Sequence, residues 1–180
     1  MNTLFDPAAE AARFAERQAL LARQAALRLD LAPGITLQPE TTESVEDQVR
    51  ETLLAEGLDP ARNPEDLAEA RRSFAVLAPR RESGGHSLAA TLFLGFPAEE
   101  REARLAALHR FPDGLLLELS DGSTVPPEVD RGGAGPEDRL PAVLALRWTL
   151  PQGRRPAAIL STSPPLRGRF PGPDAWERWY

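Results

Sequence analysis

Four polar side chains near the start of a predicted helix are the strongest candidates for chemistry in this chain. Ser44, Gln48 and Glu51 lie at helical spacing and therefore share one side of a helix, and Glu40 comes just before its start. Such a group predicts a polar pocket in which Glu40 or Glu51 binds a cation or acts as a general base. The alternative is structural: Glu40 caps an adjacent turn, and Gln48 bonds a neighbouring backbone group from a half-buried position.

Acidic and basic side chains offer two further candidate sites. Glu43, Asp47 and Glu51 form an i, i+4, i+8 stripe, but carboxylates of a single helix rarely converge on a cation, which favours a solvated face. Arginines gather in adjacent pairs and near the C-terminus, where they would have to converge in the fold to clamp an anion. Ordinary surface arginine is the alternative for each: Arg71 and Arg72, Arg80 and Arg81, Arg154 and Arg155, Arg167, and Arg169.

Several chemistries are excluded by residue types. The sequence has no cysteine, so thiolate nucleophiles, disulfides within the chain and cysteine-ligated metals are ruled out. It has no lysine either, which excludes Schiff-base chemistry. The only two histidines, His86 and His109, flank predicted turns and stand in no metal-ligand pattern. Neither Ser83 nor Ser161 has a nucleophile elbow around it. We therefore expect no metal, no cofactor and no catalytic residue that the sequence can name.

Composition restricts the class of protein. The 180 residues are 42% hydrophobic, enough for one core, and the net charge of −6 argues against a nucleic-acid binder. No apolar run approaches the ~20 residues of a membrane span. We expect a soluble, cytoplasmic protein that binds neither membrane nor nucleic acid and is a monomer or homodimer. Its exclusive use of arginine and its wealth of alanine, proline and leucine indicate a GC-rich or thermophilic source.

The elements that must position these side chains are predicted as helices first and strands later. Local signals predict helices at 7–28, 42–56, 64–78 and 97–108, beginning for example at Pro7 and at Asn63-Pro64. We expect the first helix to pack through a stripe of Ala11, Phe14, Leu21 and Ala25, and the second through Val45, Val49 and Leu53.

Strand signals dominate the second half of the chain. Continuous apolar runs predict strands at 88–96, 142–150 and 156–162, and Asp121-Gly122 predicts a hairpin between 115–119 and 123–125. The segments 80–85 and 129–138 are expected to be loops. This order predicts an α+β fold, with N-terminal helices packed on a mostly antiparallel sheet formed by the C-terminal half.

The C-terminal segment is a separate prediction. We expect residues 1–162 to form a single α+β domain and residues 163–180 to form a proline-rich strap outside regular structure. The strap ends in Trp176, Trp179 and Tyr180. These aromatic side chains form either a clasp on their own domain or an anchor for a partner. Trp148, within a predicted strand, is expected in the core.

Several segments resemble a bacterial family known as domain of unknown function 3501. The resemblance covers residues 28–40, which precede the second predicted helix, and the predicted strands 88–94 and 142–150. On the helix itself it includes Glu43-Ser-Val45, Gln48-Val49 and Glu51. The chain departs from the family where Gly95 replaces an acid and where the segment from Ser161 lacks a histidine. If the family used those two residues in a site, this chain would be short of ligands.

The resemblance implies no activity, and it leaves two classes of function. The first is an accessory or protein-interaction protein with an unknown protein partner, associated with a redox or iron–sulfur system as family gene neighbourhoods imply. The second is a small ligand-binding protein or enzyme whose pocket lies around the second helix. Whether Glu40, Gln48 and Glu51 meet in a cavity with an arginine would discriminate between them.

Overall fold

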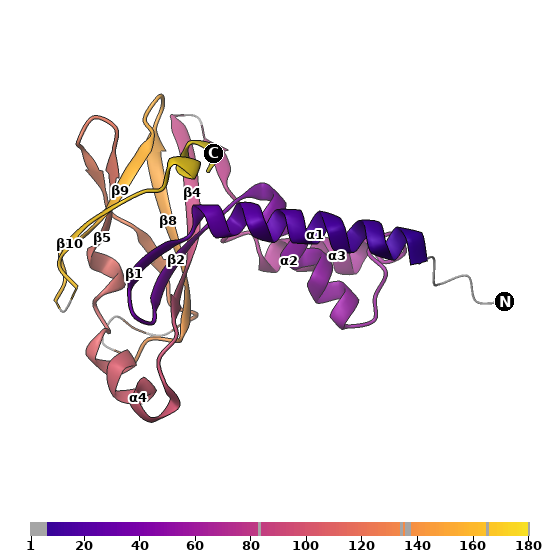
Figure 1. The fold of residues 1–180 in the computed structure, drawn as a ribbon, viewed down its shortest axis with the longest axis horizontal. Coiled ribbons are helices and arrows are strands. Elements are labelled where there is room, and N and C mark those ends of the chain that lie inside the picture. Colours follow the sequence, from indigo (N-terminus) through magenta and orange to yellow (C-terminus); the bar gives the residue numbers. More distant parts are fainter. Residues whose placement is uncertain (1–6, 83, 134, 136–137, 165, 180) are drawn as a thin grey trace.

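Two antiparallel β-sheets face each other and enclose the main hydrophobic core (Figure 1). The structure is a computed structural model that describes residues 7–82, 84–133, 135, 138–164 and 166–179. In this part of the chain the larger sheet has six strands, in the order β1 (Leu29–Ala32), β2 (Ile35–Glu40), β4 (Gly85–Leu94), β8 (Val143–Pro151) and β7 (Glu128–Asp130), with β3 (Arg80–Glu82) paired to β4. The smaller sheet has the order β10 (Gly168–Pro171), β9 (Pro156–Ser161), β5 (Leu115–Leu119) and β6 (Thr124–Val125).

Alternation of side chains along the strands places the core between the sheets. Leu115, Leu117 and Leu119 of β5 point inward from the smaller sheet, and Trp148 lies among the inward leucines of β8. Residues 87–92 of β4 are buried on both faces, which explains their almost continuous apolar sequence, whereas Phe93 is 42% exposed.

Three helices form an arm that projects from the outer face of the larger sheet (Figure 1). They are α1 (Pro7–Leu27), α2 (Thr42–Ala55) and α3 (Pro64–Ser73). Val49 and Leu53 of α2 pack against Ala70 of α3 in a small second core. Helix α4 (Ala98–Ala107) and the short 3₁₀ helix η1 (Pro112–Gly114) connect β4 to β5. The α+β prediction is confirmed.

Local sequence signals placed most elements correctly. Val45, Val49 and Leu53 are buried as predicted, and Leu105 of α4 and the adjoining Leu108 are buried as well. The Asp121-Gly122 hairpin forms, with Leu117 opposite Val125. Pro33-Gly34 forms the β1–β2 turn, where Gly34 has φ +79° and a Cβ would lie 2.7 Å from the carbonyl oxygen of Gly95.

The predicted packing stripe of α1 is wrong. Ala11, Phe14, Leu21 and Ala25 are all exposed, with Phe14 at 64% and Leu21 at 43%. The helix docks through Leu20 and Leu27, which lie on a different face. The sequence pattern identified an apolar face, but the domain does not cover it. None of the helices in the described residues is long and apolar enough to cross a membrane.

Two predicted loops contain strands. Arg80–Glu82 pairs with β4 as β3, and Glu128–Asp130 pairs with β8 as β7. The hairpin strand β1 was also missed. These short segments lack apolar runs, and backbone pairing with a neighbouring long strand overrides their weak local preference.

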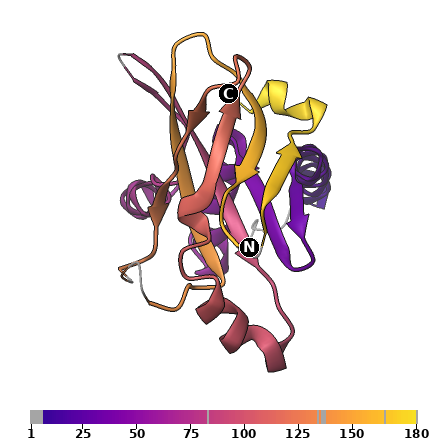
Figure 2. The same cartoon turned by 90° about the vertical axis from the view of Figure 1, so that its left-hand side faces the viewer.

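The C-terminal segment enters the smaller sheet rather than staying outside regular structure. Gly168–Pro171 forms β10, which pairs with β9. Gly168 lies opposite Ser161 at one end of this pairing, and Pro171 lies opposite Ala158 at the other. Pro171 stands at the end of this edge strand, where a proline is tolerated. The 3₁₀ helix η2 (Asp174–Arg178) follows. Figure 2 shows η2 above the strands near α1.

Candidate functional site

Glu40 is the centre of the polar cluster, and its side chain is only 2% exposed. Its Oε1 accepts a hydrogen bond from Thr91 Oγ1 at 2.6 Å. Its Oε2 accepts from Ser44 Oγ at 2.7 Å and from Gln48 Nε2 at 3.0 Å. Three donors from β4 and α2 therefore converge on one buried carboxylate of β2.

The first turn of α2 fixes this geometry. Thr41 is the N-cap: its hydroxyl accepts from the Ser44 amide at 3.1 Å, and the Thr41 amide donates to Ser44 Oγ at 2.8 Å. This reciprocal capping box holds the Ser44 hydroxyl beside Glu40. The 40, 44, 48 spacing brings Gln48 one turn further along the same side. The positive end of the helix dipole also favours a carboxylate here.

The arrangement joins three elements through one carboxylate. Both carboxylate oxygens have donors, and Glu40 lines none of the three clefts described below. A group that is enclosed and fully hydrogen-bonded fixes β2, β4 and α2 in one orientation. This fits the structural alternative, although Gln48 bonds the Glu40 carboxylate rather than a backbone group.

Glu51 lies apart from this cluster. Its carboxylate pairs with Arg17 of α1 at 2.7 Å and is well exposed. Glu43 pairs in the same way with Arg23 at 2.9 Å, and Asp47 lines the same cleft between α1 and α2, of about 680 Å³. Two of the three carboxylates of the acidic stripe therefore pair with guanidinium groups of α1. The stripe faces the arginines of α1.

An apolar groove lies where α1, α2 and the C-terminal turn meet. It has a volume of about 610 Å³ and is lined mainly by Leu20, Ala26, Leu27, Pro79 and Trp179, with Thr41 and Arg23 among its polar groups. A third cleft, of about 590 Å³, borders the β1–β2 turn and includes Asp30 and Thr36. The Thr36 hydroxyl, and then Arg28, donate hydrogen bonds to Asp30 and lower the pKa of that carboxyl.

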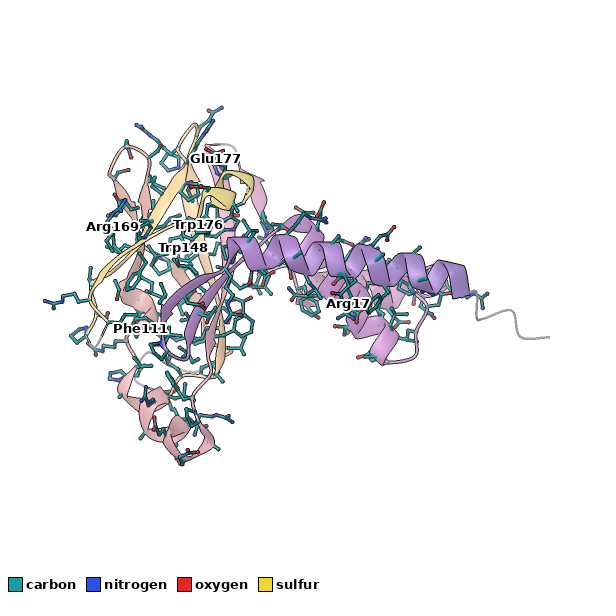
Figure 3. The ribbon with its side chains drawn as sticks, in the orientation of Figure 1. Arg17, Phe111, Trp148, Arg169, Trp176 and Glu177 are labelled. Carbon is teal, nitrogen blue, oxygen red and sulfur yellow. The ribbon has the colours of Figure 1, made fainter. Side chains whose placement is uncertain are left out.

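The C-terminal tryptophans are part of the core. Trp176 and Trp179 are 2% and 1% exposed, and their ring centroids lie 4.9 Å apart. Trp179 meets Trp148 edge to face at 6.0 Å, and Figure 3 shows Trp176 and Trp148 between the sheets and the end of α1. The indole nitrogens donate to the carbonyls of Leu27 and Ala89. Tyr180 lies outside the described residues.

The arginine candidates do not converge on one site. Arg71 pairs with Glu46, Arg154 with Asp121, and Arg169 with Glu118, on separate parts of the molecule (Arg169 in Figure 3). Arg80 donates to the carbonyl of Ala75. Arg72, Arg155 and Arg167 are exposed, and the side chain of Arg81 lies outside the described residues. Within the described residues, no three histidine, aspartate or glutamate side chains lie close enough together to hold a metal ion.

Sequence reasoning missed two side chains that organise this region. Thr91 is the one polar residue in the strand segment 88–94. A single polar residue in an apolar strand indicates a buried hydrogen-bond partner, and that partner is Glu40. Arg147 donates to Ser87 Oγ at 2.9 Å and to the carbonyls of Ala75 and Val76, so it ties the segment after α3 to the sheet. The alternating pattern of β8 gave no sign of this role.

The most unusual surface is the outward side of α1. With about 100° between successive residues, Phe14, Leu21 and Ala25 lie within about 40° of one another and at least about 100° from Leu20. We call this side the α1 outer face; its seven exposed members are Ala11, Phe14, Ala15, Gln18, Leu21, Ala22 and Ala25.

The charged side chains of α1 lie on the opposite side of the helix. Arg13, Glu16, Arg17 and Arg23 line the cleft toward α2 and remain exposed, and Phe14, at the edge of the outer face, borders the same cleft. Arg17 in Figure 3 points from α1 toward the other helices of the arm. The apolar outer face of α1 is therefore exposed to solvent, whereas a surface helix usually packs its apolar side on the domain.

Comparison with known proteins identifies the family. None of the curated proteins is similar to the chain in sequence. A crystal structure of a novel protein of unknown function from Burkholderia pseudomallei is similar in fold, with a TM-score of 0.75 and 22% identity over 96% of this chain and 91% of that chain. A model of the family described as protein of unknown function (DUF3501) matches residues 6–164. The chain therefore belongs to the DUF3501 family.

Proposed function

We propose that this protein is a non-catalytic, cytoplasmic interaction protein and that it binds its partner through the α1 outer face. One observation supports this most strongly: an apolar helix face is left in solvent, with Phe14 at 64% and Leu21 at 43% exposure, while four charged side chains of the same helix line the cleft toward α2. Contiguous apolar surface on a folded domain marks an interaction site. The polar cluster adds support because its carboxylate is enclosed and already hydrogen-bonded.

The setting we propose is that of an accessory to a redox or iron–sulfur system, which the family resemblance suggests. The chain itself has no cysteine, so its part in such a system would be to bind or position another protein rather than to ligate a cluster through thiolates.

Site-specific photo-crosslinking in the source cells tests the proposal. A photoreactive amino acid at position 14 should give discrete adducts on irradiation, whether with another protein or with a second copy. The matched control is position 12, since Ala12 is exposed on α1 but lies off the outer face. Position 14 giving no more adducts than position 12 would overturn the proposal.

A small apolar ligand is the second candidate because of the groove of about 610 Å³ beside Trp179. Its size and mainly apolar lining are typical of ligand sites. An apolar fluorescent dye should then bind saturably and change tryptophan emission. Ala26→Trp, which fills the groove, should abolish this binding. Phe14→Ala, which does not change the groove, should leave dye binding unaffected. A dye that binds both variants equally well would count against a ligand in this groove.

A further inference from the structure

We propose that the partner of the α1 outer face is a second copy of this chain, with the two α1 helices antiparallel across a two-fold axis. This inference rests on the proposed function, since it names the occupant of the same surface. Three features of the α1 outer face favour a second copy: the order of its side chains, the placement of charge on α1, and the size of the contact.

The order of residues on the outer face is nearly symmetric about Gln18. Ala11 matches Ala25, Phe14 matches Leu21, and Ala15 matches Ala22, with midpoints at 18, 17.5 and 18.5. A two-fold interface requires such self-complementarity, because residue i contacts residue j of the partner while j contacts i. In the antiparallel pair each Phe14 meets the partner's Leu21, and alanines meet alanines.

Gln18 then meets its own counterpart at the axis. A primary amide both donates and accepts hydrogen bonds, so two such groups facing each other satisfy one another. A single polar residue within an apolar helix seam fixes the register of pairing. The alanines on either side allow close approach of the two helices. A parallel pair would instead place Phe14 against Phe14 and Leu21 against Leu21, and the contact between Phe14 and Leu21 would be lost.

Charge does not oppose this pairing. The charged residues Arg13, Glu16, Arg17 and Arg23 lie in the cleft toward α2, and two of them form ion pairs there: Arg17 with Glu51 and Arg23 with Glu43. The seam therefore brings no like charges together. Figure 2 shows α1 end-on at the rim of the molecule, where its outward side is not covered by either sheet.

The size of the face indicates a reversible dimer. From Ala11 to Ala25 the helix rises about 21 Å. Two such faces bury on the order of 1,000 Å² together, at the lower limit for a specific interface. We therefore expect an association that depends on concentration rather than a permanent dimer.

Sedimentation velocity over a dilution series provides the first test. The purified chain should pass from monomer to dimer as its concentration rises, and Leu21→Glu should weaken this association at least about tenfold, because a two-fold interface contains the substituted site twice. The matched control is Val143→Glu, which places the same charge at an exposed apolar position of β8 away from the outer face and should leave association unchanged. Thermal unfolding of each variant confirms that the fold is intact. A chain that stays monomeric throughout overturns the inference.

Disulfide crosslinking tests the antiparallel register, and the absence of native cysteine makes it clean. Gln18→Cys should form a linked dimer under mild oxidation, and Ala11→Cys mixed with Ala25→Cys should form mainly the mixed dimer. Efficient self-linking of Ala11→Cys would overturn the antiparallel arrangement. If the chain is monomeric while position 14 crosslinks to a different protein in cells, this inference fails and the proposed interaction function stands.

Discussion

Glu40 and Phe14 both lie in environments that are unusual for their residue types: the acid is 2% exposed, and the aromatic residue is 64% exposed. Around Glu40, three donors from the neighbouring strand and helix satisfy the carboxylate. Phe14 borders the cleft toward α2 but is mostly exposed, as are the other residues of the α1 outer face. A buried polar group that is satisfied holds a fold together, whereas an exposed apolar face that is unsatisfied calls for a partner.

The largest difference between the two regions is expected for aromatic side chains. Trp179→Ala should lower the free energy of unfolding by about 3–5 kcal/mol, because it opens a cavity against Trp148 and Trp176. Deleting residues 174–180 should be at least as costly. Phe14→Ala should change dilute-protein stability by no more than about 0.5 kcal/mol. Chemical denaturation of Trp179→Ala and Phe14→Ala measures these two changes in the free energy of unfolding. Equal losses for the two variants would show that the two regions do not differ in this way.

A second contrast separates the two acids of the predicted pocket. Glu40→Ala leaves the hydroxyls of Thr91 and Ser44 and the amide of Gln48 without their acceptor, and we expect a loss of about 3 kcal/mol. Glu51→Ala removes one exposed ion pair with Arg17 and should cost under about 1 kcal/mol. Thermal melts should show a drop of roughly 6–12 °C for the first variant, at about 2–4 °C per kcal/mol. If Glu40→Ala melts like the wild type, the cluster does not hold the fold together.

A glutamine pair gives a smaller effect. Gln48→Ala removes one of three donors to Glu40 and should destabilise the protein by about 1–2 kcal/mol. Gln18→Ala, on the α1 outer face, should leave the unfolding of dilute protein unchanged. Equilibrium urea unfolding at one protein concentration compares them. An unchanged midpoint for Gln48→Ala would mean that this amide serves a role other than stability.

The smallest expected effect concerns Asp30, an exposed acid that, like Glu40, accepts a hydrogen bond from a threonine. The Thr36 hydroxyl and Arg28 lower the Asp30 pKa, so its stabilisation is present above the ordinary aspartate pKa of about 3.9 and is lost as the pH falls through the lowered value. Asp30→Asn should cost under about 1 kcal/mol at neutral pH. The difference from wild type should disappear well below pH 3.9; a difference that grows toward acid pH would contradict the assignment.

These contrasts also mark how far sequence alone could go. The caps, turns and periodicities of α2, α4 and the Asp121-Gly122 hairpin are local signals, and the predicted elements formed. Helical spacing correctly placed Ser44 and Gln48 on one side of α2, because i, i+4 neighbours meet in any helix, and Glu40 was expected just before its start. Glu51 also lies at helical spacing from Ser44 and Gln48, but its side chain pairs with Arg17 instead of joining the Glu40 cluster. Local sequence rules do not specify which of two nearby groups a side chain on a helix will contact.

What sequence could not supply was the packing of elements distant along the chain. The apolar stripe of α1 was found correctly as a pattern, but its direction was assigned inward because surface helices usually turn that side to the core. Here the arginines of α1 meet the acids of α2, and that match between two helices reverses the orientation. Thr91 likewise gained its meaning only when β4 was placed beside β2.

The central claim is that the α1 outer face is covered in the working protein. Its most direct test is the rate at which a thiol reagent alkylates Ala25→Cys in intact source cells, compared with Ala12→Cys in the same cells and with both variants as dilute purified protein. We predict that alkylation at position 25 is several-fold slower in cells than in dilute solution, relative to position 12. Equal relative rates in cells and in dilute solution would show that the face stays in solvent, and would contradict the account.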